Sequence, residues 1–110
     1  MRVNPDRLIR RIEEMNRIGP LPGGGNCRLS LSNEDKDARD LLGKWMKEEG
    51  LETKVDEVGN MFGIRAGEGS QPALALGSHL DTVSTGGRYD GTYGVLAALE
   101  VASVLKERNV

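Results

Sequence analysis

The residues best suited to chemistry are one histidine and two aspartates within twelve positions of one another. His79 is the only histidine, Asp81 follows it by two residues, and Asp90 lies further along the same stretch. At the end of an extended strand, the side chains of His79 and Asp81 lie on the same face. A carboxylate beside an imidazole fixes its tautomer and makes the other ring nitrogen a better metal ligand. Asp90 opens an apolar helix, so we expect its carboxylate near the helix N-terminus and the same pocket.

Each of these residues also has an ordinary interpretation. Asp90-Gly91 could be a simple turn, Asp81 could cap a turn, and a lone histidine is usually a polar residue with a partner. A serine-hydrolase arrangement of Ser78 and His79 is disfavoured, because adjacent strand residues point to opposite faces. A catalytic zinc usually has three protein ligands, whereas only His79 and Asp90 are candidates here. The missing ligands are expected from sequence outside this chain or from another chain.

Three helices and three strands are predicted to position these side chains. Helical spacing of apolar residues predicts helices over 5–18 and 33–49, with Asn4 and a Ser32/Asp35 capping box at their starts. Glu48-Glu49 reads as a solvated helix end. Strands are predicted over 52–58 and 61–65 around the turn Gly59-Asn60, and over 73–78, an almost uncharged run typical of a strand covered on both faces. The helix predicted over 94–108 is apolar nearly all round and therefore needs burial.

Composition excludes several classes of protein. Fifteen basic and 17 acidic residues give a net charge of −2, without the basic footprint of a nucleic-acid-binding protein. No apolar run approaches the roughly 18 residues of a membrane span. The single cysteine, Cys27, cannot form an internal disulfide, which favours a reduced, cytoplasmic setting and an ordinary thiol. The chain has 110 residues. The predicted strand over 73–78 and helix over 94–108 both need burial by more protein than these residues supply, so we expect the chain to be part of a larger fold.

The motifs around these residues resemble a known family. Gly77-Ser78-His79-Leu80-Asp81-Thr82-Val83, followed by Gly86-Gly87-Arg88-Tyr89-Asp90-Gly91, is similar to the N-carbamoyl-L-amino-acid hydrolases and allantoate amidohydrolases. These belong to the aminoacylase and carboxypeptidase-like dinuclear metallohydrolases. The stretch over 28–36 and Val58-Gly59-Asn60 resemble the family too. The His-x-Asp motif alone suggests only the superfamily, whereas the Gly-Gly-Arg-Tyr-Asp-Gly extension favours the carbamoyl and ureido hydrolases.

The resemblance implies an α/β fold in which residues 1–110 are the N-terminal portion of a three-layer αβα catalytic domain. The lid and dimerisation domain, the general base and the later ligands would lie downstream. It also implies that His79 binds one metal ion, that Asp81 orients His79, and that Asp90 bridges two divalent ions. The ions would be zinc, or manganese, cobalt or nickel.

The same resemblance implies hydrolysis of a non-peptide carbon–nitrogen bond. N-carbamoyl-L-amino acids, cleaved to the amino acid, CO2 and ammonia, are the first substrate hypothesis, and allantoate is the alternative. A small ureido molecule is thus the expected partner, with neither nucleic acid nor membrane, and the full-length protein is expected to be a homodimer. A third hypothesis is that the 110 residues alone are an inactive fragment.

Overall fold

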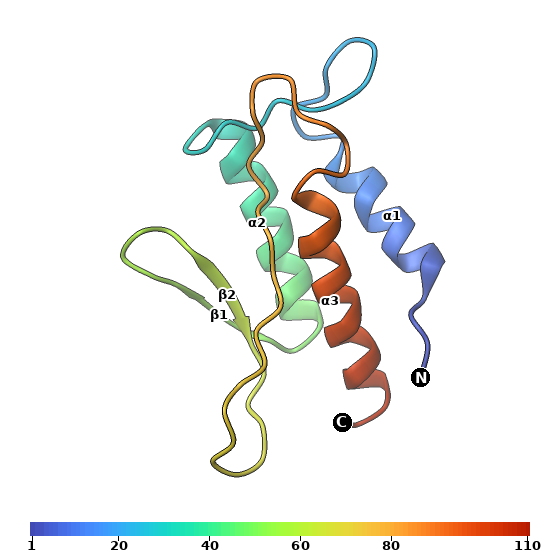
Figure 1. Cartoon of the computed structure of the whole chain (residues 1–110), viewed down its shortest axis with the longest axis vertical. Coiled ribbons are helices and arrows are strands. Elements are labelled where there is room, and N and C mark those ends of the chain that lie inside the picture. Colours follow the sequence, from blue (N-terminus) through green and yellow to red (C-terminus); the bar gives the residue numbers. More distant parts are fainter.

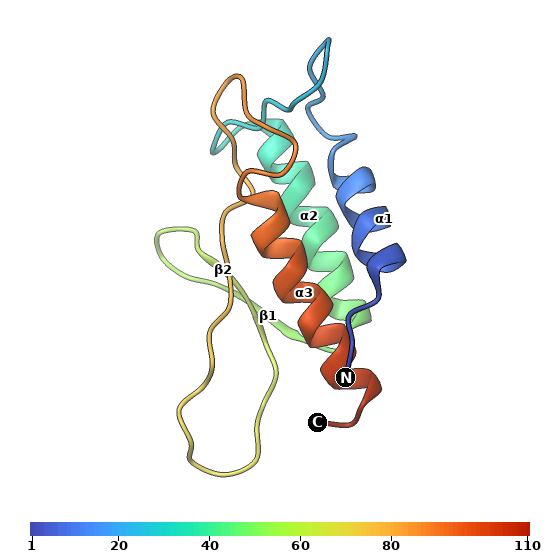
Figure 2. The same ribbon diagram turned by 45° about the vertical axis from the view of Figure 1, so that its right-hand side comes forward.

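The computed structural model describes all residues from 1 to 110 as three helices and one hairpin. The elements follow in the order α1 (Pro5–Met15), α2 (Asn33–Glu48), β1 (Glu52–Val55), β2 (Met61–Ile64) and α3 (Thr92–Glu107). The three helices lie alongside one another, and the hairpin projects from the α2 side (Figures 1 and 2). The chain is therefore a small α/β unit whose helices were predicted in the right places.

The apolar core lies between the three helices. It consists of side chains from all three helices and one residue of the segment before α3: Ile12, Met15, Ala38, Leu42, Trp45, Met46, Leu80, Leu96 and Leu99. The helical spacing in the sequence identified the members from α1 and α2 correctly, because residues three and four apart share one helix face. Ile9 of α1, although apolar, is exposed.

Local hydrogen bonds explain where the first two helices start. The Asn4 side chain accepts from the Arg7 N–H, with Pro5 in the first turn, where its missing N–H costs nothing. Ser32 Oγ accepts from the Asp35 N–H at 3.1 Å, and the Asp35 carboxylate accepts from the Leu31 N–H. The predicted capping side chains are thus confirmed at both helix starts.

The hairpin is shorter than the sequence predicted. Strands β1 and β2 pair antiparallel from Glu52↔Ile64 to Val55↔Met61, so the predicted ends at 58 and 65 are wrong. The Asp56 carboxylate accepts hydrogen bonds from the Val58 N–H, the Asn60 N–H and the Asn60 side chain. These bonds, that from the Asn60 side chain foremost, lower the pKa of Asp56 and hold residues 56–60 as a longer loop.

The predicted strand over 73–78 does not form. The backbone of residues 66–78 makes no hydrogen bond within the chain, and in both views this stretch runs past the hairpin without pairing with it (Figures 1 and 2). Leu74 is 87% exposed, so the expected cover on both faces is also absent. A strand exists only where a neighbour satisfies its backbone groups, and no segment of this chain does so here.

The third helix also departs from prediction. It spans Thr92–Glu107, in place of 94–108, and buries one face rather than its whole surface. Leu96 and Leu99 face the core, whereas Tyr93 and Val101 are exposed.

The first two helices also end earlier than predicted, at Met15 and Glu48. No helix of the chain combines the length and the apolar character that crossing a bilayer requires.

A buried ion network joins the helices away from the predicted site. Glu100 is fully buried in α3, and it accepts from the Arg7 guanidinium and from the Asn4 N–H. Arg11 donates to Glu49 at 2.5 Å, and the Glu49 side chain is only 13% exposed. Expecting Glu49 to be solvated was therefore wrong, because the local pattern at the end of α2 does not reveal a cation arriving from α1.

Candidate metal centre

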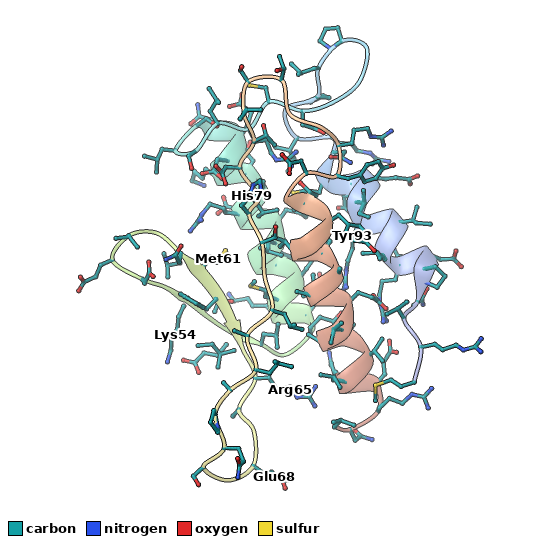
Figure 3. All side chains as sticks on the ribbon, viewed as in Figure 1. Lys54, Met61, Arg65, Glu68, His79 and Tyr93 are labelled. Atoms are coloured by element: carbon teal, nitrogen blue, oxygen red, sulfur yellow. The ribbon has the colours of Figure 1, made fainter.

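His79 lies between the two aspartates that the sequence singled out. Its Nδ1 is 2.8 Å from the backbone oxygen of Asp81 and 3.6 Å from the Asp81 carboxylate. Its Nε2 is 3.8 Å from Oδ1 of Asp90. A carbonyl oxygen can only accept, so Nδ1 carries the proton and Nε2 of the neutral ring is left with a free lone pair facing Asp90. Figure 3 shows His79 on the extended segment beside the start of α3.

The contact between Asp81 and His79 differs in one respect from the expected one. The backbone carbonyl of Asp81, rather than its carboxylate, holds the ring nitrogen, since 3.6 Å is too long for a hydrogen bond. The effect on the ring is the same as a carboxylate would have, because either acceptor fixes the proton on Nδ1.

The spacing of the two candidate ligands suits a shared divalent ion. Two bonds of the length usual for zinc, at a tetrahedral angle, separate the donor atoms by about 3.4 Å. The observed 3.8 Å between Nε2 and Oδ1 is close to that value. Imidazole and carboxylate together suit zinc and other transition metals.

The two ligands alone do not complete a metal site. No group of three or more histidine, cysteine, aspartate or glutamate side chains in this chain could hold an ion. The His79 and Asp90 side chains are 49% and 71% exposed. The pair is thus a candidate for part of a metal site only, and it is open to solvent.

A tight turn places Asp90 beside the histidine. The Thr92 N–H donates to the Asp90 carbonyl at 2.8 Å, which closes a three-residue turn around Gly91. Gly91 has φ 71° and ψ −53°, a positive-φ γ-turn that is strained for residues with a side chain. A Cβ at this position would overlap the backbone oxygen and the imidazole of His79. Glycine is required here because the chain passes directly against the candidate ligand.

The glycines around the site allow close contacts within the segment that carries it. A Cβ at Gly86 would press on Thr82, and one at Gly94 on Ser78. Gly86 also exchanges two backbone hydrogen bonds with Asn26, at 2.9 and 3.0 Å. The two bonds between Asn26 and Gly86 hold the loop after α1 against the loop before α3.

Sequence reasoning missed one buried residue behind the site, Arg28. It is fully buried, and its side chain donates to the Leu80 carbonyl and to the Thr92 hydroxyl. Burial lowers the pKa of its guanidinium, an effect that Asp35 opposes. No local pattern marks it, because a single arginine in a charged N-terminal half reads as solvated; only the resemblance of residues 28–36 included it.

The chain is similar in sequence to curated amidohydrolases. It is 41% identical over 109 residues to an N-carbamoyl-L-amino-acid amidohydrolase of Pseudomonas sp., a match over 98% of this chain and 26% of that protein. It is 44% identical over 97 residues to the allantoate amidohydrolase of Bacillus subtilis, over 87% of this chain and 24% of that one. The chain thus spans about a quarter of the length of the curated relatives it matches. No protein-family model matches it.

Solved structures agree with the sequence comparison. A hydantoinase/carbamoylase family amidase from Burkholderia ambifaria superposes with a TM-score of 0.94 at 45% identity. The match covers 98% of this chain and 27% of the amidase. The fold described above is therefore that of the N-terminal part of such amidases.

Proposed function

Because the chain belongs to the hydantoinase/carbamoylase family of amidohydrolases, we propose that it supplies part of a divalent-metal centre that hydrolyses a non-peptide carbon–nitrogen bond. The observation that carries the proposal is the pairing of His79 Nε2 with Asp90 Oδ1 at 3.8 Å, with Nδ1 held from behind by Asp81. We propose two divalent ions, which are zinc or, as the alternatives, manganese, cobalt or nickel.

In this proposal each residue has a separate task. His79 would hold a divalent ion through Nε2, and the Asp90 carboxylate would serve as the second ligand of the centre. Asp81 keeps the proton on Nδ1, so that the lone pair of Nε2 stays available to a metal ion. Gly91 has no Cβ, so the His79 ring can occupy its position facing Asp90. Divalent ions at such a centre polarise the scissile carbonyl and activate water.

The substrate class is proposed from the relatives. Proteins named N-carbamoyl-L-amino-acid amidohydrolase and allantoate amidohydrolase match at similar identity, 41% and 44%. Both names denote hydrolysis of a carbon–nitrogen bond in a ureido-type compound. We propose N-carbamoyl-L-amino acids as the substrates, and allantoate as the second candidate, favoured by the Bacillus subtilis match. The 110 residues alone are proposed to be inactive, since they hold only two candidate ligands and no group of three or more that could hold an ion.

Metal titration of the 110-residue chain tests the proposal. Calorimetry with ZnCl2 and with MnCl2 should show stoichiometric binding, weakened more than about tenfold in His79→Ala and in Asp90→Asn. Asp37→Asn removes an exposed carboxylate on α2 and serves as the matched control, with unchanged affinity. Equal affinity in all four proteins would contradict the assignment of the ligands.

A hydrolysis assay tests the inactivity of the chain. N-carbamoyl-L-amino acids and allantoate are offered to the metal-loaded chain, and ammonia release is measured. We expect release no faster than with the metal alone. Turnover that is lost in Asp90→Asn would show that the chain needs no further ligands, and would overturn this part of the proposal.

A further inference from the structure

Arg28 is buried without a carboxylate partner. Its side chain is completely inaccessible, and it takes part in none of the salt bridges of the chain. The guanidinium donates instead to three carbonyls and one hydroxyl, at Leu80, Ile18, Met15 and Thr92. Met15 is the last residue of α1 and Ile18 lies three residues beyond it, so two of these carbonyls are at the helix C-terminus, where the helix dipole favours a cation. The charge is thus held by oriented backbone groups.

Two of the four acceptors of Arg28 lie in the two segments that carry the candidate ligands, one in each. Leu80 stands between His79 and Asp81, and its carbonyl accepts from Nε of Arg28 at 3.2 Å. Thr92 follows Asp90 by two residues, and its hydroxyl accepts from the guanidinium at 2.7 Å. One rigid group therefore spans the gap between the two ligand segments, which otherwise make few direct bonds to each other.

The backbone of Arg28 strengthens the same link. Its carbonyl accepts from the Thr82 N–H at 2.8 Å, and its N–H donates to the Thr82 hydroxyl at 2.8 Å. The segment after His79 is thereby fastened to residue 28 by both backbone and side chain. A buried cation is costly unless it is hydrogen-bonded, and here each bond also joins two parts of the chain. Two of the bonds end beside His79 and Asp90, so the same contacts that satisfy the charge also fix the ligand segments.

We propose that Arg28 is a positioning residue, which sets the separation between His79 and Asp90 so that both can bind one ion. The inference rests on the metal centre proposed above, but the part that concerns the geometry of His79 does not need a metal. Lysine cannot replace Arg28 in this role, because its donors radiate from a single point and do not form a planar fork.

The first measurement is made on the metal-free chain by NMR. A Cβ at Gly91 would overlap the His79 ring, so a Gly91 Hα lies against it and should give a nuclear Overhauser effect to the ring Hε1. We expect this effect to weaken in Arg28→Lys, and also in Thr92→Val, which removes one acceptor of Arg28 without changing the size of the side chain. An effect of unchanged intensity in both variants would overturn the proposal.

Arg11→Met is the matched control. Arg11 is also buried, but it contacts Ser103 and Glu49 and stacks over Trp45, away from both ligand segments. We expect this variant to lose stability in urea while it keeps the wild-type contact between His79 and Gly91. If Arg11→Met weakened the contact as much as Thr92→Val does, general loosening would explain the result, and the positioning role would be refuted.

The second measurement is Zn²⁺ affinity by calorimetry. Arg28→Lys and Thr92→Val should bind about tenfold more weakly than wild type, and Arg11→Met within twofold of it. Wild-type affinity in both site variants would overturn the metal part of the inference. If wild type itself bound no Zn²⁺ while the NMR contact still depended on Arg28, the proposed function would fail and the positioning of His79 would stand. Should Arg28→Lys fail to fold, Thr92→Val decides both measurements.

Discussion

Replacing Gly91 by alanine should damage the candidate site more than the overall fold. The added methyl group enters the space occupied by the His79 ring and backbone oxygen. The ring must then leave its hydrogen bond with the Asp81 carbonyl, which is 2.8 Å long in the wild type. The substitution therefore displaces Nε2 of His79, the candidate metal ligand that faces Asp90.

The size of the effect follows from two contributions. A side chain at φ 71° and ψ −53° lies in a sparsely populated region, which costs about 1–3 kcal/mol. Loss of the His79 hydrogen bond adds about 1 kcal/mol. Gly91→Ala should thus lower the free energy of unfolding by at least about 2–4 kcal/mol, since the overlap with the His79 backbone oxygen adds to both contributions. This is a large part of the roughly 5–15 kcal/mol that typically stabilises a folded domain.

Gly50→Ala is the matched control for backbone strain. Gly50 has φ 77°, but no atom lies within 4 Å of a Cβ built there. Its substitution should cost about 1–2 kcal/mol and leave Zn²⁺ affinity unchanged. Urea unfolding followed by circular dichroism and Zn²⁺ calorimetry would compare the two variants. Equal stability losses, together with equal affinities, would refute the claim that Gly91 is needed for His79.

Three further predictions concern the rest of the chain. Burial alone would raise the pKa of Glu100, but hydrogen bonds from Arg7 and Asn4 outweigh it and the pKa is lowered; stability should therefore fall as the pH drops below about 4.3, and urea midpoints of Glu100→Gln should fall less steeply. Leu96→Ala should cost about 2–5 kcal/mol in urea unfolding, and Leu74→Ala less than about 0.5 kcal/mol, since only Leu96 is in the core. Amide exchange should be unprotected over residues 66–78 and slow in α3; protection of Leu76 would contradict the unpaired backbone described above.

Prediction from the sequence succeeded where the determining interactions are local. The starts of α1 and α2 depend on Asn4 and Ser32, which bond to backbone groups three residues away. The buried faces of these helices follow from the spacing of residues such as Ile12 and Leu42, which a helix places on one side. The clustering of His79 and Asp90 with Asp81 could also be predicted, because all three residues lie in one short stretch.

Prediction failed where a residue depends on a distant partner. The stretch over 73–78 has the composition of a buried strand, but pairing needs a neighbour that these 110 residues do not provide. Glu49 reads as solvated from its own helix, whereas Arg11, 38 positions away, buries it. Arg28 is the clearest case, since its acceptors at Leu80 and Thr92 are 52 and 64 positions distant.

These distant bonds separate the geometry of the site from the stability of the chain. The apolar core joins the helices along their length, and the Glu100 network ties α1 to α3 with charges. The candidate ligands are instead exposed, and their spacing depends on hydrogen bonds of Arg28 and on the turn at Gly91. Changes in the core should therefore lower stability with little effect on metal affinity until the chain unfolds. Thr92→Val also leaves one buried donor of Arg28 unpaired and so lowers stability. It should nevertheless weaken metal binding more than a core change of equal cost in stability, because it relaxes the spacing between His79 and Asp90.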